Sequence, residues 1–178
     1  MKNMTRETIK FRLMTEQDLN LFFGWLQDPL LVEIWLMNRP MKYEEVVQKY
    51  LPRIEGKTPI TCFIITVEGN PIGFIQSYLW RNFPEESSLM TPEERNSATF
   101  DMFIGESALR GRGLGTRIVS KFLDDILFKK YQVDLCIGLT LTTNPRAIRT
   151  LEKAGFKRSR TQVFPKEPAP CVLMAFSR

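Results

Sequence analysis

The strongest restriction on the fold comes from residues 99–126, where three kinds of pattern follow one another. The apolar run Thr99–Ile104 predicts a buried strand, and three glycines follow it in a basic setting. Apolar residues then recur four apart (Leu114, Ile118, Phe122 and Ile126), which predicts an amphipathic helix. Glycines let backbone N–H groups approach a ligand, and the start of a helix carries partial positive charge. This order of strand, loop and helix therefore predicts a binding site for a phosphate group.

Three phosphate-binding patterns can be compared with this loop. A Walker A loop requires GxxxxGK[ST], which is absent. A Rossmann fingerprint requires GxGxxG and an acidic residue about 20 positions later; Asp134 has that place, but Gly115 comes one residue early. The third pattern, Arg110-x-x-Gly113-x-Gly115, resembles the pyrophosphate-binding loop (Q/R-x-x-G-x-G/A) of the GCN5-related N-acetyltransferases (GNAT). A glycine-rich turn without a ligand is the alternative for these six residues.

A second motif strengthens the resemblance. Residues 144–156 look like the next motif of that family, a helix that starts at an Asn and ends in Glu-Lys-x-Gly-Phe. Five further segments resemble the aminoglycoside 6′-N-acetyltransferases: 11–19, 50–52, 71–78, 113–116 and 146–149. The resemblance implies acetyl-CoA as the cofactor and an acetyl transfer to a primary amine, the 6′-amine of an aminoglycoside antibiotic. A small-molecule partner and a monomer or homodimer are expected with it.

The whole chain, residues 1–178, is expected to form a single domain of the α/β (α+β) class. By resemblance it has a central, mixed, mostly antiparallel, twisted sheet of about six or seven strands, flanked by about four helices. The cofactor-binding core is expected at about 98–157 and the acceptor-site elements at about 20–97. Strands are predicted at 9–13, 61–67, 72–79, 99–104, 135–141, 156–164 and 171–176.

Helices are predicted after Thr15, at 43–54, after Gly113 and at 144–155. Asp28-Pro29 is expected to end the first of these helices, and Pro52 to interrupt the last turn of the second. Residues 81–97 are expected to be a long polar surface loop.

Composition excludes several kinds of chemistry. The 178 residues contain no histidine, which excludes Ser-His-Asp and Cys-His triads, His-ligated zinc and an imidazole base. Cys62, Cys136 and Cys171 form no CxxC pair, so no metal is expected, and they are interpreted as reduced core residues. The sequence shows no membrane span and no secretory signal, so a cytoplasmic location without a membrane partner is expected. The net charge of +5 fits a phosphate-bearing cofactor, while no dense Lys/Arg stripe indicates a nucleic-acid partner.

The resemblance assigns cofactor contacts to two places on the chain. Backbone amides of the loop would hold the pyrophosphate, and Phe103 and Ile104 would offer backbone groups to the pantetheine arm. Asn144 would contact the cofactor or simply cap its helix. The loop residues are Arg110, Gly111, Arg112, Gly113, Leu114, Gly115 and Thr116.

Asp101 is the candidate catalytic residue and also an acceptor contact, because a carboxylate must take the proton of the attacking amine. A solvent-facing strand residue is the alternative. The family's tyrosine proton donor corresponds here to Leu151, which cannot donate a proton, and a second acidic acceptor position corresponds to Leu139. Acceptor binding is otherwise assigned to Trp35, Tyr50, Gln76, Glu85 and Glu86, although Tyr50 also suits a helix core and the glutamates a solvated loop.

Three other functions remain open from the sequence. One is an acyltransferase for another small amine or a siderophore precursor. Another is a catalytically silent acyl-CoA-binding protein, which Leu151 would suit. The third is nucleic-acid binding, which is supported only by the net positive charge of the sequence.

Overall fold

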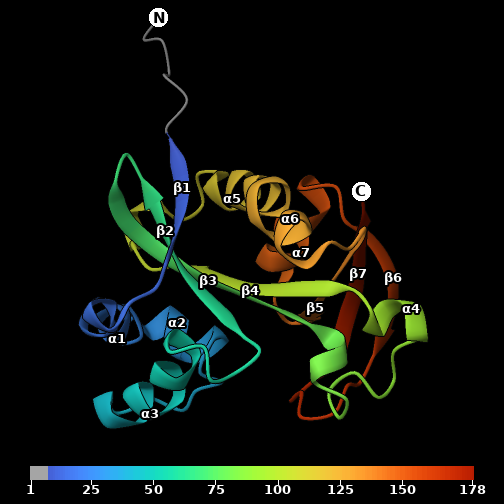
Figure 1. Cartoon of the computed structure of the whole chain (residues 1–178), viewed down its shortest axis with the longest axis horizontal. Coiled ribbons are helices and arrows are strands. Elements are labelled where there is room, and N and C mark those ends of the chain that lie inside the picture. The colour runs from blue at the N-terminus through green and yellow to red at the C-terminus, as the bar shows by residue number, and fades with distance from the viewer. Residues whose placement is uncertain (1–7) are drawn as a thin grey trace, which may run out of the picture. The chain divides into compact units, whose positions relative to one another are not determined.

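A computed structural model describes residues 8–178. Within them, seven strands form a mixed sheet in the order β1-β2-β3-β4-β5-β7-β6 (Figure 1). The pair β4–β5 is parallel, whereas β1–β2, β5–β7 and β6–β7 are antiparallel. The expected single domain with a mixed sheet is confirmed. The strands are β1 (Ile9–Leu13), β2 (Thr61–Val67), β3 (Asn70–Leu79), β4 (Ala98–Ile104), β5 (Leu135–Leu141), β6 (Lys157–Gln162) and β7 (Cys171–Ser177).

The chain divides into two compact units by its contacts. The first contains the described residues up to Gln76 together with Asp101–Arg110, and the second contains Ser77–Phe100 together with Gly111–Arg178. Strands β3 and β4 therefore contribute residues to both units. The functional division into acceptor elements and a cofactor core is of a different kind and stays a prediction.

The core of the first unit is an aromatic cluster around Phe22 of α1. The ring of Phe22 lies 4.5 Å from that of Tyr50, 4.8 Å from that of Phe74 and 5.7 Å from that of Phe103, measured between centroids. These rings come from α1, α3, β3 and β4, so their packing fixes the elements that carry the candidate acceptor site. The helices of this unit are α1 (Leu19–Trp25), α2 (Pro29–Ile34) and α3 (Tyr43–Ile54), with short 3-10 turns at Glu16–Asp18 and Ser107–Leu109.

Helix α2 was not predicted, and the role expected for Asp28-Pro29 is wrong. α1 ends at Trp25, and Asp28-Pro29 begins α2 instead of ending a helix. Oδ1 of Asp28 accepts hydrogen bonds from the amides of Leu30 and Leu31 at 3.0 and 3.3 Å. Pro29 suits the first helical position, where no N–H is needed and φ is already helical. The expected interruption at Pro52 is not seen: α3 runs through this residue to Ile54, the predicted end of the helix.

The second unit has a separate core that includes Trp80, Ile137 and Leu173. The indole Nε1 of Trp80 donates to the carbonyl of Ile137 at 3.0 Å, which joins the end of β3 to β5. The segment predicted as a loop at 81–97 contains a short helix, α4 (Pro92–Arg95), and the 3-10 turn Trp80–Asn82 precedes it. No helix among residues 8–178 is long and apolar enough to cross a lipid bilayer.

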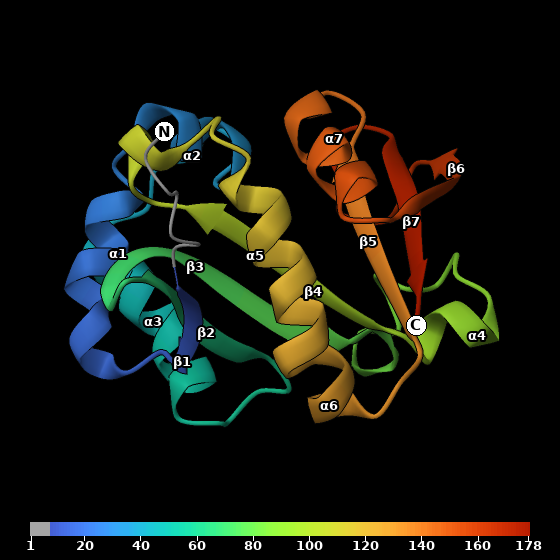
Figure 2. The ribbon, with the colours of Figure 1, turned by 90° about the horizontal axis from the view of Figure 1, so that it is seen from above.

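The helix after the glycine loop runs on as one rod of three parts (Figure 2). These are α5 (Leu114–Phe122), a π-helical turn (Leu123–Leu127) and α6 (Phe128–Tyr131). A π turn holds an extra residue, so the buried face shifts along the chain. Leu127 is therefore buried and Ile126 only half-buried, which corrects the expected four-residue spacing at that end. α7 (Pro145–Lys153) follows β5 as predicted.

Candidate functional site

A chain of hydrogen bonds ends on Asp101, the predicted catalytic carboxylate. Nε2 of Gln76 on β3 donates to Oδ2 of Asp101 on β4 at 2.9 Å. Nη1 of Arg53 on α3 donates to Oε1 of the same Gln76 side chain at 2.7 Å. Gln76 is buried, and Asp101 and Arg53 are half-buried. A hydrogen bond donated to a carboxylate favours its ionised form, which is the form a general base needs.

Tyr50 and Trp35, two predicted acceptor residues, meet beside this chain. The indole Nε1 of Trp35 donates to the hydroxyl of Tyr50 at 3.3 Å, and the guanidinium of Arg53 lies 4.9 Å from the centre of the Tyr50 ring. Tyr50 is fully buried, and burial raises its pKa to about 12. The structure thus brings together Trp35, Tyr50, Gln76 and Asp101, and both the core and the acceptor interpretation of Tyr50 fit its position.

The electrostatic surroundings of Asp101 are positive on the side of α3. Lys49 and Arg53 both lie on this helix within electrostatic range of one another, and Lys49 also interacts with Asp101. Although Lys49 as a residue is exposed, protein atoms crowd its ammonium group. This desolvation, and next the repulsion by Arg53, lower the pKa of Lys49, while Asp101 opposes the shift.

Arg110 holds the loop after β4 by its side chain. Its Nε donates to the carbonyl of Ile104 and its Nη2 to that of Gly105, both at 2.8 Å, and its Nη1 pairs with Asp28 at 3.0 Å. The guanidinium is therefore engaged with the protein itself and holds the loop in place, while a contact of Arg110 with the cofactor stays a prediction. It ties the loop to the start of α2, the helix that leads to Trp35.

The same loop is anchored at Gly105 by Trp25. Nε1 of Trp25 donates to Oε1 of Glu106 at 2.9 Å. A Cβ atom on Gly105 would lie 2.3 Å from the Trp25 ring, so only glycine permits this approach. Phe103 is buried, Ile104 is half-buried, and the Phe103 ring lies 4.9 Å from that of Trp35. These contacts fix the end of β4, where the backbone of Phe103 and Ile104 is expected to meet the pantetheine arm.

The glycine loop leads into the start of α5 as predicted. Gly113 caps this nine-residue helix with φ +76°, a left-handed conformation that favours glycine. Added Cβ atoms on Gly111 and Gly113 would meet no atom of the described chain within 4 Å, so the loop is open beside both residues. The first backbone amides of any α-helix lack intrahelical partners. Those of Leu114, Gly115 and Thr116 therefore suit an anion, which fits the pyrophosphate of acetyl-CoA.

Asn144 acts as a helix cap, the second of the two roles expected for it. Its Oδ1 accepts from the backbone amide of Ala147 at 3.2 Å, and Pro145 occupies the first position of α7. On the same helix, Leu151 is buried. Leu139 on β5 packs against the core of the second unit. Asn144 as a cofactor contact stays a prediction.

Glu85 and Glu86 belong to the second unit, where Lys166 pairs with both, at 2.9 and 2.8 Å. Their negative charge is therefore only partly compensated within that unit, and their role in acceptor binding stays a prediction.

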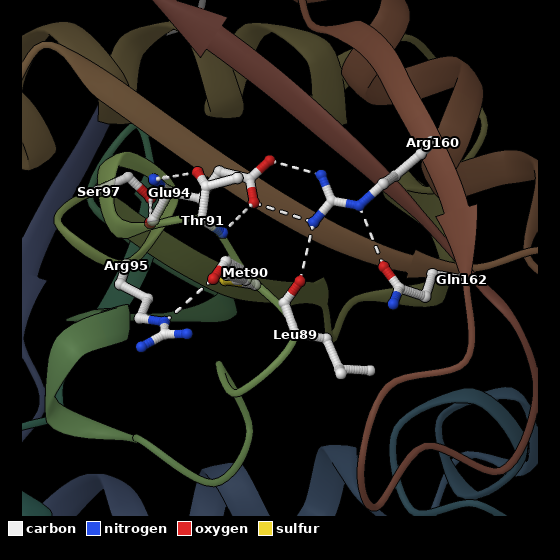
Figure 3. Close-up of polar contacts among 8 residues, drawn as sticks. All are labelled: Leu89, Met90, Thr91, Glu94, Arg95, Ser97, Arg160 and Gln162. Atoms are coloured by element: carbon white, nitrogen blue, oxygen red, sulfur yellow. Dashed lines mark hydrogen bonds and ion pairs between the residues drawn. The ribbon is translucent and has the colours of Figure 1, made fainter.

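A bidentate ion pair at Glu94 holds the segment between β3 and β4, which also contains Glu85 and Glu86. The guanidinium of Arg160 on β6 faces the Glu94 carboxylate and bonds both oxygens, at 2.6 and 2.9 Å (Figure 3). Its Nη2 also donates to the carbonyl of Leu89 at 3.2 Å, and Gln162 accepts from its Nε at 3.1 Å. This bidentate pair fixes α4 against the edge strand.

Comparison with known proteins gives the family. Residues 14–164 match the family described as acetyltransferase (GNAT) domain. The chain belongs to this family. The strand, the glycine loop and the two motif helices of this GNAT chain are those that the sequence resemblance predicted.

Two relatives and one solved structure are similar to the chain in sequence, and a further structure shares only its fold. The chain is 33% identical over 174 residues to the aminoglycoside N(6′)-acetyltransferase type 1 of Klebsiella pneumoniae, which covers 93% of this chain and 82% of the relative. A protein of the same name from Serratia marcescens gives the same figures. The structure of aminoglycoside acetyltransferase AAC(6′)-Ib with coenzyme A and kanamycin superposes with a TM-score of 0.85 at 30% identity, covering 96% of this chain and 95% of that one. Spermidine N-acetyltransferase from Vibrio cholerae, with a TM-score of 0.72 and 16% identity, shares the fold.

Proposed function

We propose that this chain is an aminoglycoside 6′-N-acetyltransferase, which transfers the acetyl group of acetyl-CoA to the 6′-amine of an aminoglycoside. The observation that carries the proposal is the carboxylate of Asp101 on β4, the strand that leads into the glycine loop, which accepts a hydrogen bond from Gln76 on β3. Similarity to aminoglycoside N(6′)-acetyltransferases over 93% of the chain supports the acceptor.

Each residue of the site has a role in this reaction. Acetyl-CoA, when bound, supplies the thioester whose acetyl group passes to the amine. Backbone amides of Gly111 to Thr116 hold the pyrophosphate, and the backbone at Phe103 and Ile104 aligns the pantetheine arm. Asp101 takes the proton that the attacking amine loses, directly or through water. Leu151 has no proton to give, so water or another residue would have to protonate the departing thiolate.

The test is release of free coenzyme A thiol from acetyl-CoA in the presence of kanamycin, tobramycin or amikacin. Each drug is compared with a derivative that lacks the 6′-amine. We expect turnover with the parent drugs and none with the derivatives. Equal turnover with both members of a pair would contradict the regiochemistry, and no turnover despite bound acetyl-CoA would contradict the acceptor class.

A second candidate function is acetylation of a small amine that carries less positive charge. One observation favours it: Lys49 and Arg53 place positive charge beside Asp101. A polycation would be repelled by these groups. The sequence resemblance points the same way, because Leu139 corresponds to an acidic acceptor position of that family. A panel of amines that includes siderophore precursors, tested in the same thiol assay, decides between the two acceptors.

We also propose a cytoplasmic location and a monomer or homodimer as the working form. Acetyl-CoA is an intracellular metabolite, and all three cysteines are free and buried, which fits a reducing compartment. Arg53, Gln76 and Asp101 come from one chain, so this part of the site is complete in a monomer. Analytical ultracentrifugation measures the oligomeric state.

A further inference from the structure

The hydrogen-bond chain on Asp101 has a fixed direction, and Arg53 sets it. A guanidinium carries five N–H donors and no acceptor. Gln76, in contrast, has an oxygen and an NH₂ group at the end of its side chain, and these two exchange places when the amide turns over. Because Nη1 of Arg53 lies 2.7 Å from Gln76, only the oxygen of Gln76 can face it. The NH₂ group must then face Asp101.

The direction of this chain decides which form of Asp101 is favoured. With NH₂ toward Asp101, Oδ2 must accept, which stabilises the carboxylate. With the Gln76 amide turned over, an oxygen would face Oδ2, and only the protonated acid could then hydrogen-bond to it. Gln76 is 7% exposed, so water has little room to compensate for the wrong orientation.

We propose that Arg53 is a positioning residue that locks the amide of Gln76 with its NH₂ group toward Asp101 and so keeps Asp101 ionised as the base. The importance of this lock for catalysis rests on the proposed function, in which Asp101 takes the amine proton. The lock itself is a property of the free protein and is measurable without any acceptor.

Charged and titratable groups around Arg53 and Asp101 come from α3 and β2. Lys49, Tyr50 and Arg53 lie on α3, and Cys62 lies on β2. Burial raises the pKa of both Tyr50 and Cys62 to about 12, so these two stay neutral between pH 3 and 8. Lys49 acts on Asp101 through its charge, but within residues 8–178 it makes no hydrogen bond to Gln76. It therefore provides the control for a loss of charge alone.

The experiment is an NMR titration of the full chain, labelled with ¹³C at the aspartate carboxyl, between pH 3 and 8. The Asp101 signal is assigned by its loss in Asp101→Asn. We expect Arg53→Met to raise the pKa of Asp101 by about 1–2 pH units, because both the charge and the lock are lost. Arg53→Lys, which keeps a donor and the charge, should restore most of the shift. Lys49→Met should give a clearly smaller shift than Arg53→Met.

A second pair of variants separates the lock from the charge of Arg53. In Gln76→Met there is no amide to turn over, so adding Arg53→Met should shift the pKa of Asp101 much less than it does with Gln76 present. An equal effect of Arg53→Met in both backgrounds, or equal shifts in Arg53→Met and Lys49→Met, would overturn the proposal.

A third measurement uses the unaltered protein, so it does not depend on whether the Arg53 and Gln76 variants fold. The side-chain NH₂ protons of Gln76 in the unaltered protein should move as Asp101 titrates; protons that do not respond to that titration would overturn the proposal. The acid limb of kcat/KM should then shift in Arg53→Met by the same amount as the pKa of Asp101. If no amine is acetylated, the proposed function fails, while the NMR titration still decides the role of Arg53.

Discussion

Single side chains in the candidate site are restricted by what they can donate and accept. Asp101 accepts from Gln76, Tyr50 accepts from Trp35, and Arg110 gives its donors to two carbonyls and to Asp28. The sequence predicted Asp101, Gln76, Tyr50 and Trp35 as site residues, each by resemblance. It gave no sign of Arg53, because an arginine in the last turn of a helix is already accounted for by the helix dipole.

Replacing Asp101 by Asn removes the proton acceptor and keeps the size of the side chain. We expect turnover to fall by at least about 100-fold, since general base catalysis contributes that much or more. The affinity for acetyl-CoA should not change, because no contact to it is assigned to the Asp101 side chain. Steady-state kinetics and calorimetric titration with acetyl-CoA measure the two quantities. Turnover close to that of the unaltered protein would remove Asp101 from the mechanism.

Gly105→Ala tests the close approach of Trp25 to the loop after β4. The new Cβ would lie 2.3 Å from the Trp25 ring, so the ring or the loop must move. We expect the free energy of unfolding to fall by about 1–3 kcal/mol, as for other overpacked sites. Urea denaturation measures it.

The matched control for this change is Gly24→Ala in α1, one residue before Trp25. A Cβ there meets no atom of residues 8–178 within 4 Å, and alanine favours the helix by about 0.5–1 kcal/mol over glycine. Gly24→Ala should therefore stabilise the chain. Equal effects of the two substitutions would show that the contact with Trp25 is without consequence.

Two helices of this chain, α2 and α7, begin with the same pair of features, a side-chain cap followed by a proline. Asn144-Pro145 was predicted to begin a helix and does so, by a side-chain cap followed by a proline at the first position. Asp28-Pro29 has the same pattern and also begins a helix, whereas the rule that a residue before proline leaves the helical conformation predicts an ending there. The π turn inside the helical rod carries no local signal of this kind, because Leu123–Leu127 would fit an α-helix equally well.

Asn144→Ala tests whether this residue does more than cap α7. Loss of the cap should lower the free energy of unfolding by about 1 kcal/mol. Asn144→Ser keeps an N-cap hydroxyl and should preserve most of that stability. If Asn144 also contacts the cofactor, both variants should bind acetyl-CoA more weakly. Unchanged affinity in both would leave Asn144 with the capping role alone.

At the scale of the whole molecule, long-range ion pairs join segments that the sequence gives no reason to pair. Arg160 and Glu94 are 66 positions apart in the sequence. Local sequence patterns relate only residues that are much closer together. The strands and most helices follow from local alternation and spacing. The pairing of a glutamate in the short helix α4 with an arginine on the edge strand depends on tertiary placement, which periodicity does not encode.

Acid should destabilise the chain through this pair. The hydrogen bond from Arg160 lowers the pKa of Glu94 below its ordinary value, so the folded state binds a proton less readily than the unfolded chain. The stabilisation is therefore complete above about pH 4.5 and is lost as the pH falls through the lowered pKa. We expect Tm to drop below that pH, and to drop less in Glu94→Gln, which is already less stable at pH 7 by about 1 kcal/mol. Calorimetry at a series of pH values measures both, and parallel Tm curves for the two proteins would contradict the assignment.

The reactivity of the three cysteines reports how often the folded structure opens locally. Cys62, Cys136 and Cys171 are all buried, and burial raises their pKa values, that of Cys171 to about 11. Only a thiolate attacks a disulfide reagent, so the cysteines of the native chain should not react with such a reagent. They should therefore add no background to an assay of the coenzyme A thiol. Each sulfur reacts only when its surroundings open. The rate at which each sulfur is labelled therefore measures how often the structure around that cysteine opens.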